Sequence, residues 1–193
     1  MAGTDVVDPI ALASWANAIT VSRLLLSPLV FLAIVDHPEG SWVAFALWVV
    51  LCASDAFDGW VARRRGPSRS GAFLDPLADK VLVLGAMFTL VANGTFWIVP
   101  VLIIAAREFI VSVYRSVVGA RGVSVPASRL AKRKTLVQQI AVGFAIAPTT
   151  AIDASWIADI FLWAAVVLAL VSGYDYLRGA RSQRSASPVR IAS

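Results

Sequence analysis

Long apolar runs limit what this chain can fold into. Runs of about 17 to 25 residues, which cross roughly 30 Å of hydrocarbon as a helix, recur along its 193 residues. With 59% hydrophobic residues and a mean hydropathy of +0.76, the chain is more apolar than a soluble core requires. It is therefore predicted to be an all-α integral membrane protein. We place six transmembrane helices near residues 19–35, 42–62, 71–92, 96–117, 134–151 and 156–177.

The two ends differ from these spans. Residues 9–18 begin with Pro9 after Asp8 and contain Trp15, which favours a short amphipathic helix at the membrane surface. The first 18 residues lack the Lys/Arg-rich region of a secretory signal, so we expect no cleaved peptide. The predicted organisation is an N-terminal tail and amphipathic segment at 1–18, a six-helix domain at 19–178 and a basic disordered tail at 179–193.

Basic residues gather in alternate connections between the spans. They form three groups: Arg63, Arg64, Arg65 and Arg69; Arg121, Arg129, Lys132, Arg133 and Lys134; and Arg178, Arg181, Arg184 and Arg190. The positive-inside rule then predicts that both termini and both basic loops face the cytoplasm, in a multi-pass protein of the cell (inner) membrane. Most of the basic residues lie in these groups, and no soluble face is left for nucleic acid.

Four aspartates interrupt the second and third apolar runs. Asp55 and Asp58 are three residues apart, and Asp75 and Asp79 are four apart, so each pair shares one helix face. Gly66-Pro67 favours a turn that packs these two spans antiparallel. The four acids are therefore expected to converge near the cytoplasmic ends of both helices.

Carboxylates at partial membrane depth need compensating charge. Oxygen-only ligands favour Mg²⁺ or Mn²⁺, and Mg²⁺ often binds through few carboxylates and the phosphates of a substrate. The chain's one cysteine, Cys52, offers neither an internal disulfide nor a cysteine metal site. Two alternatives stay open: the acids only pair with Arg63, Arg64 or Lys80, or they line the path of a divalent-cation carrier.

The acidic segment resembles the signature of the CDP-alcohol phosphotransferases. All eight signature positions are present: Asp55, Asp58, Gly59, Ala62, Arg63, Gly71, Asp75 and Asp79. Asn17, Thr20 and Arg23, followed by Pro28, also resemble the first-helix pattern of that family.

The resemblance implies a six-helix membrane fold, usually homodimeric, with a polar cavity open to the cytoplasm. It implies two divalent ions, Mg²⁺ or Mn²⁺, held by Asp55, Asp58, Asp75 and Asp79, with Asp79 as general base. Gly59, Ala62, Arg63 and Gly71 are then expected to shape or contact the site of the CDP-linked donor.

Three further stretches resemble one branch of this family: DPLADKV, AREFIVSVYR at 106–115 and VPASRLAKRKTLVQ at 125–138. That branch transfers phosphatidyl from CDP-diacylglycerol to sn-glycerol 3-phosphate, giving phosphatidylglycerophosphate and CMP. For the acceptor phosphate we expect Arg107, Arg115, Lys132 and Lys134, with Arg129 behind them. An arginine within a span, such as Arg107, is costly unless it faces a cavity.

Other roles for these residues remain open. The basic loop could only fix topology and touch anionic lipid. Arg107 could pair with an acid such as Glu108 of a neighbouring helix or subunit, since adjacent residues of one helix point in different directions. The alternative function is a cardiolipin synthase of the same fold, which would take phosphatidylglycerol as acceptor and need fewer cations there.

Overall fold

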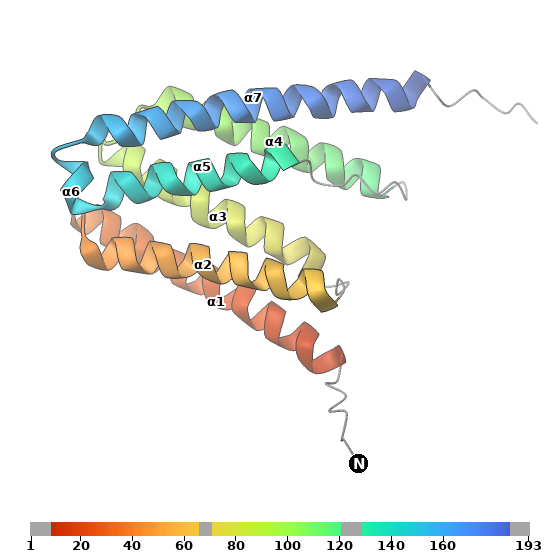
Figure 1. The fold of residues 1–193 in the computed structure, drawn as a ribbon, viewed down its shortest axis with the longest axis horizontal. Coiled ribbons are helices and arrows are strands. Elements are labelled where there is room, and N and C mark those ends of the chain that lie inside the picture. Colours follow the sequence, from red (N-terminus) through yellow and green to blue (C-terminus); the bar gives the residue numbers. More distant parts are fainter. Residues whose placement is uncertain (1–8, 66–70, 121–128, 186–193) are drawn as a thin grey trace, which may run out of the picture.

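The computed structural model of this chain is helical throughout the part it describes. It describes the backbone of residues 9–65, 71–120 and 129–185, and the side chains of 21–54, 78–118, 130 and 133–176. The described helices are α1 (Pro9–Asp36), α2 (Trp42–Arg65), α3 (Gly71–Ala92), α4 (Ile98–Ala120), α5 (Arg129–Ile146), α6 (Pro148–Ala151) and α7 (Ser155–Ser185) (Figure 1).

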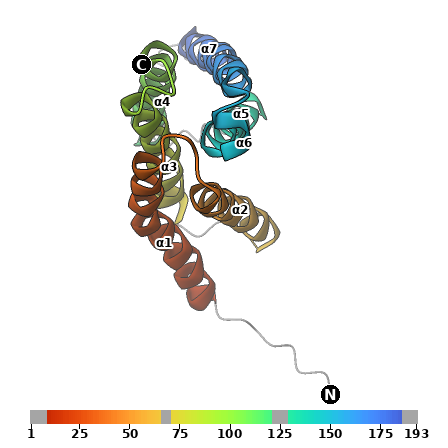
Figure 2. The same ribbon diagram turned by 90° about the vertical axis from the view of Figure 1, so that its left-hand side faces the viewer.

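The six long helices alternate in direction and form a closed bundle (Figure 1). Around the bundle the order is α1, α2, α5, α7, α4 and α3, and α3 also contacts α5 across it (Figure 2). The most extensive contacts join α1 to α3 and α5 to α7. The predicted α2–α3 pair is antiparallel, as expected, but α2 packs mainly on α1 and α5 instead of on α3.

Helix boundaries depart from the predicted spans at three places. α1 runs without a break from Pro9, so the predicted surface segment at 9–18 is not a separate helix. The physical reason is that no glycine or proline stands between Pro9 and Pro28. α5 ends at Ile146 because Pro148 cannot continue it, and α6 follows. α7 extends to Ser185, through residues assigned to the predicted disordered tail.

The bundle is apolar on the outside and partly polar inside. Leu25, Val43 and Phe109 on three different helices are 71%, 67% and 71% exposed. The buried polar and charged residues among the described side chains are Arg23, Ser27, Arg107, Glu108, Lys134, Gln138 and Ser172. An apolar exterior around buried charge is the distribution expected of helices surrounded by lipid.

The helices approach closely where α3 crosses α1. A Cβ atom placed on Gly85 would lie 2.3 Å from Cζ of Phe31. The absence of a side chain at Gly85 therefore lets the two helices approach each other, and Leu82, Ala86 and Met87 of α3 are fully buried around this crossing.

By length and composition, one helix within the described residues can cross a membrane unaided, namely α7 over Ser155–Tyr176. Residues Trp42–Ser54 of α2 form a shorter apolar stretch. The other long helices carry charged residues along their length, as in α4 with Arg107, Glu108 and Arg115.

Candidate active site

The predicted metal ligands all stand on helices at one end of the bundle. Asp55 and Asp58 lie in the second half of α2, and Asp75 and Asp79 lie in the first half of α3. Because the C-terminal end of α2 and the N-terminal end of α3 lie at the same end, the backbone brings the two pairs to a common level (Figure 1).

Side-chain positions are described for one of the four acids, Asp79. The side chains of Asp55, Asp58 and Asp75 lie outside the described residues, as do those of Gly59, Ala62, Arg63 and Gly71. Among the side chains described, no group of three or more His, Cys, Asp or Glu could hold a metal ion. The fit to a metal therefore rests on the donor chemistry of the four carboxylates and on their helical positions.

Asp79 is half-buried where three helices meet. Its Oδ1 accepts a hydrogen bond from Nε2 of Gln139 on α5 at 3.5 Å. The backbone oxygen of Gln139 in turn accepts one from the indole Nε1 of Trp48 on α2, at 3.0 Å. Through Gln139, α5 ties Asp79 to the helix that carries the other acid pair. Gln139 was not among the residues predicted from the sequence. Its position as an amide inside an apolar helix could have indicated a polar partner.

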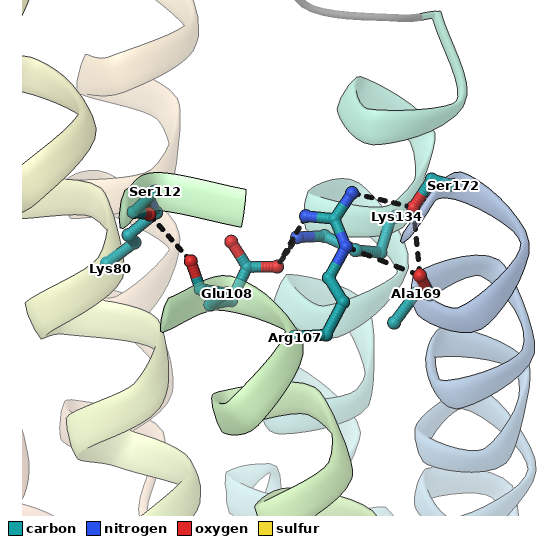
Figure 3. A network of polar contacts seen from close by, with 7 residues as sticks. All are labelled: Lys80, Arg107, Glu108, Ser112, Lys134, Ala169 and Ser172. Carbon is teal, nitrogen blue, oxygen red and sulfur yellow. Dashed lines mark hydrogen bonds and ion pairs between the residues drawn. The ribbon is translucent and has the colours of Figure 1, made fainter. Parts of the chain in front are cut away.

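A buried polar network lies beside Asp79 and joins α3, α4, α5 and α7 (Figure 3). Its centre is Arg107, which is only 8% exposed. Arg107 donates from Nε to the Ala169 backbone oxygen at 3.3 Å and from Nη2 to Oγ of Ser172 at 2.8 Å. Its guanidinium also lies 5.8 Å from the ring centre of Tyr176. These contacts fix the guanidinium against α7.

Glu108 connects Arg107 to Lys134. Nη1 of Arg107 lies 3.1 Å from Oε1 of Glu108, and Nζ of Lys134 contacts the same oxygen. The expectation that Arg107 and Glu108 point apart on their helix is therefore wrong. Both side chains are long enough to turn into the bundle, where each is less than one-tenth exposed.

Lys80 extends the network towards the aspartates. Its Nζ contacts Oγ of Ser112 on α4, and that hydroxyl donates to the Glu108 backbone oxygen at 2.6 Å. Lys80 follows Asp79 directly on α3. The carboxylate end of the site and the cationic end are thus adjacent.

The structure brings together two of the four residues predicted for the acceptor phosphate, Arg107 and Lys134. Arg115 is exposed, two turns further along α4. Lys132 lies on α5, but its side chain is outside the described residues. Glu108, Lys80, Ser112 and Ser172 are members that the sequence analysis did not assign to the site.

Two neighbouring features complete this end of the bundle. Arg23 of α1 is 1% exposed, and its Nη2 lies 3.5 Å from Oγ of Ser54, the residue before Asp55. A pocket of about 440 Å³ opens between α2 and α5, lined by residues that include Trp48, Cys52 and Gln139. Gln139 belongs both to this apolar pocket and to the contact with Asp79.

Comparison with known proteins decides the family. The sequence pattern of the CDP-alcohol phosphatidyltransferases matches residues 13–171, which include all four aspartates and the cationic network up to Ala169. The chain belongs to this family. The matched residues include both helices that carry the acid pairs, α2 and α3.

Individual members of the CDP-alcohol phosphatidyltransferase family are similar over most of the chain. A Mycobacterium tuberculosis protein named probable phosphatidylglycerophosphate synthase is 37% identical over 93% of this chain and 86% of its own length. The CDP-diacylglycerol–glycerol-3-phosphate 3-phosphatidyltransferase of Escherichia coli is 37% identical over 85% of this chain and 93% of its own length. The protein of that name in Rickettsia bellii is 32% identical over 86% of this chain and 94% of its own length.

Proposed function

We propose that this protein transfers the phosphatidyl group of CDP-diacylglycerol to sn-glycerol 3-phosphate, giving phosphatidylglycerophosphate and CMP. The observation that carries the choice of acceptor is the pair of buried cations, Arg107 and Lys134, which share one carboxylate, that of Glu108. Two buried cations with one carboxylate between them favour a further bound anion. The names of the bacterial relatives support the same acceptor and donor.

At the donor end, Asp55, Asp58, Asp75 and Asp79 are the residues proposed to hold two divalent ions, Mg²⁺ or Mn²⁺. The chemistry that such ions supply when bound is neutralisation of charge on the diphosphate and alignment of the reacting groups. Gly59, Ala62, Arg63 and Gly71 are proposed to contact the CDP part of the donor.

Asp79 is proposed to take the proton from the acceptor hydroxyl as its oxygen attacks the phosphatidyl phosphorus. A new P–O bond forms, the bond from that phosphorus to CMP breaks, and CMP leaves with the electron pair. A neutral alcohol is a poor nucleophile at neutral pH, so a carboxylate within hydrogen-bond reach accelerates the attack. The position of Asp79 between Gln139 and Lys80 supports this role.

At the acceptor end, Arg107 and Lys134 bind the phosphate of glycerol 3-phosphate, with Lys132 and Arg115 nearer the cytoplasm. Charge-assisted hydrogen bonds of this kind are about twice as strong as neutral ones. Lys80 belongs to the same network as Arg107 and Lys134, and it directly follows Asp79 on α3. An acceptor whose phosphate is held by this network therefore presents its hydroxyl towards Asp79, the proposed general base.

The whole chain is proposed to span the inner membrane six times as a homodimer, with both termini and a polar cavity on the cytoplasmic side. The apolar outer faces of the long helices support the membrane placement. The segregation of basic residues to alternate connections supports the orientation.

The test is CMP release by purified protein given CDP-diacylglycerol and one acceptor at a time: glycerol 3-phosphate, phosphatidylglycerol, inositol phosphate or serine. We expect turnover with glycerol 3-phosphate and its loss in excess EDTA. Turnover with phosphatidylglycerol in place of glycerol 3-phosphate would make the protein a cardiolipin synthase, and full activity in EDTA would contradict the metal assignment.

A further inference from the structure

Glu108 holds two cations at once inside the bundle. One carboxylate oxygen, Oε1, meets both Nη1 of Arg107 and Nζ of Lys134, and Glu108 is 7% exposed (Figure 3). Arg107 is also anchored to α7 through Ala169 and Ser172. Lys134, which is 2% exposed, contacts Glu108 within this network.

The network of Figure 3 contains more positive than negative charge. Among the residues drawn there, three cations, Lys80, Arg107 and Lys134, accompany one carboxylate, that of Glu108. A cluster in which cations outnumber carboxylates suits a bound anion.

A phosphate monoester interacts more strongly with such a cluster than a phosphodiester does. The monoester carries about −1.5 to −2 near pH 7, because its second pKa is about 6, whereas a phosphodiester carries a single negative charge. Glycerol 3-phosphate is a monoester, and phosphatidylglycerol is a diester. Cations placed together therefore favour glycerol 3-phosphate of the two candidate acceptors.

We propose that Glu108 is a positioning and specificity-determining residue of the acceptor site. It holds the Lys134 ammonium and the Arg107 guanidinium side by side, so that both can meet the phosphate monoester of the acceptor. This inference rests on the proposed function, because it concerns the same acceptor site. It assigns no contact between Glu108 and the reacting atoms.

Removal of the Glu108 charge leaves Lys134 buried without its carboxylate. A buried ammonium without a counter-ion loses its proton or moves towards water, and in both cases it no longer contributes a placed positive charge to the acceptor phosphate. A charge-assisted hydrogen bond contributes roughly 1.5 to 3 kcal/mol, which corresponds to about a tenfold to hundredfold change in affinity.

The experiment uses Glu108→Gln, Glu108→Asp and the control Glu39→Gln. Glu39 and Glu108 are the two glutamates of the chain, and Glu39 lies exposed beside His37 in the connection between α1 and α2. For each purified variant we would measure kcat, both KM values, the melting temperature, and binding of glycerol 3-phosphate at equilibrium in the absence of donor.

For Glu108→Gln we expect the KM and the Kd of glycerol 3-phosphate to rise tenfold or more, while the KM of CDP-diacylglycerol stays within about twofold. The preference for glycerol 3-phosphate over phosphatidylglycerol should fall by a similar factor. Glu108→Asp keeps the charge and should recover part of the affinity, and Glu39→Gln should match the wild type.

Three outcomes would overturn the inference: unchanged binding of glycerol 3-phosphate in Glu108→Gln, equal rises in both KM values with a lowered melting temperature, or no recovery in Glu108→Asp. The second outcome would make Glu108 a structural link between α4 and α5. Binding without donor separates this inference from the proposed function. If the wild-type protein binds glycerol 3-phosphate, and Glu108→Gln weakens that binding, but no CMP is ever released, the proposed function is contradicted and the inference about Glu108 stands.

Discussion

Asp79 is the residue at which the chemistry of the proposed reaction can be tested most directly. It is the predicted metal ligand with a described hydrogen bond, to Gln139, and it directly precedes Lys80 of the cationic network on α3. Asp79→Asn keeps the size and one oxygen of the side chain but removes most of its basicity. We expect kcat to fall by roughly 10² to 10⁴, the range for loss of a general base.

CMP release and CDP-diacylglycerol binding should be measured on the same folded Asp79→Asn protein. Binding should weaken less than turnover, because three carboxylates remain for the metal. The matched control is Asp153→Asn, an exposed aspartate in the connection between α6 and α7. Near wild-type turnover in Asp79→Asn would assign activation of the hydroxyl to the metal alone.

The sequence predicted the aspartates of the candidate site better than it predicted the cationic network beside them. The aspartates repeat at helical spacing in apolar runs, so their grouping on α2 and α3 follows from the sequence alone. Arg107 was expected because an arginine within a span is costly unless it faces a cavity, and Lys134 was expected as a cation at the start of the fifth span. The contact of Glu108 with Arg107 and Lys134 was not predicted, because adjacent residues of a helix point in different directions. The long side chains of Arg107 and Glu108 nevertheless turn towards each other inside the bundle, where Lys134 of α5 joins them.

At the scale of the helix, the crossing of α1 and α3 is the feature most sensitive to side-chain volume. Gly85→Leu would place its first side-chain atom against the ring of Phe31, where a Cβ already lies 2.3 Å from Cζ. Overpacking of this kind costs typically about 1 to 3 kcal/mol. We expect a lower melting temperature in detergent and a weaker α1–α3 contact.

Two variants make the Gly85 test specific. Ala164→Leu adds similar volume on an exposed face of α7 and should leave the melting temperature unchanged. Gly85→Leu combined with Phe31→Ala should recover part of the loss, because the ring is removed from the added side chain. If the double variant is no more stable than Gly85→Leu, the contact with Phe31 does not account for the destabilisation.

Helix positions were largely predictable, and helix partners were not. Five of the predicted spans overlap one long helix each along most of their length, and the sixth, at 134–151, is interrupted by Pro148. The partner of each helix depends on the shape of facing surfaces, as at Gly85, and hydropathy does not record that shape. For this reason the α1–α3 pair was missed and an α2–α3 pair was expected.

For the molecule as a whole, the proposed orientation gives a prediction that is independent of activity. A reporter that is active only in the cytoplasm should work when fused to either terminus, and it should fail when inserted near Gly94 or Asp153, in connections without Lys or Arg. Opposite activity at the two termini would require an odd number of spans and contradict the proposed topology.

The pairing of helices in this bundle also bears on how the chain assembles as it is made. The two most extensive contacts join α1 to α3 and α5 to α7. Only the four-residue α6 separates α5 from α7, whereas a whole long helix, α2, separates α1 from α3. When α2 emerges, α1 therefore still lacks its main partner. Biosynthesis proceeds through an interval in which α1 has an open face, and a chain that stops before α3 leaves that face uncovered.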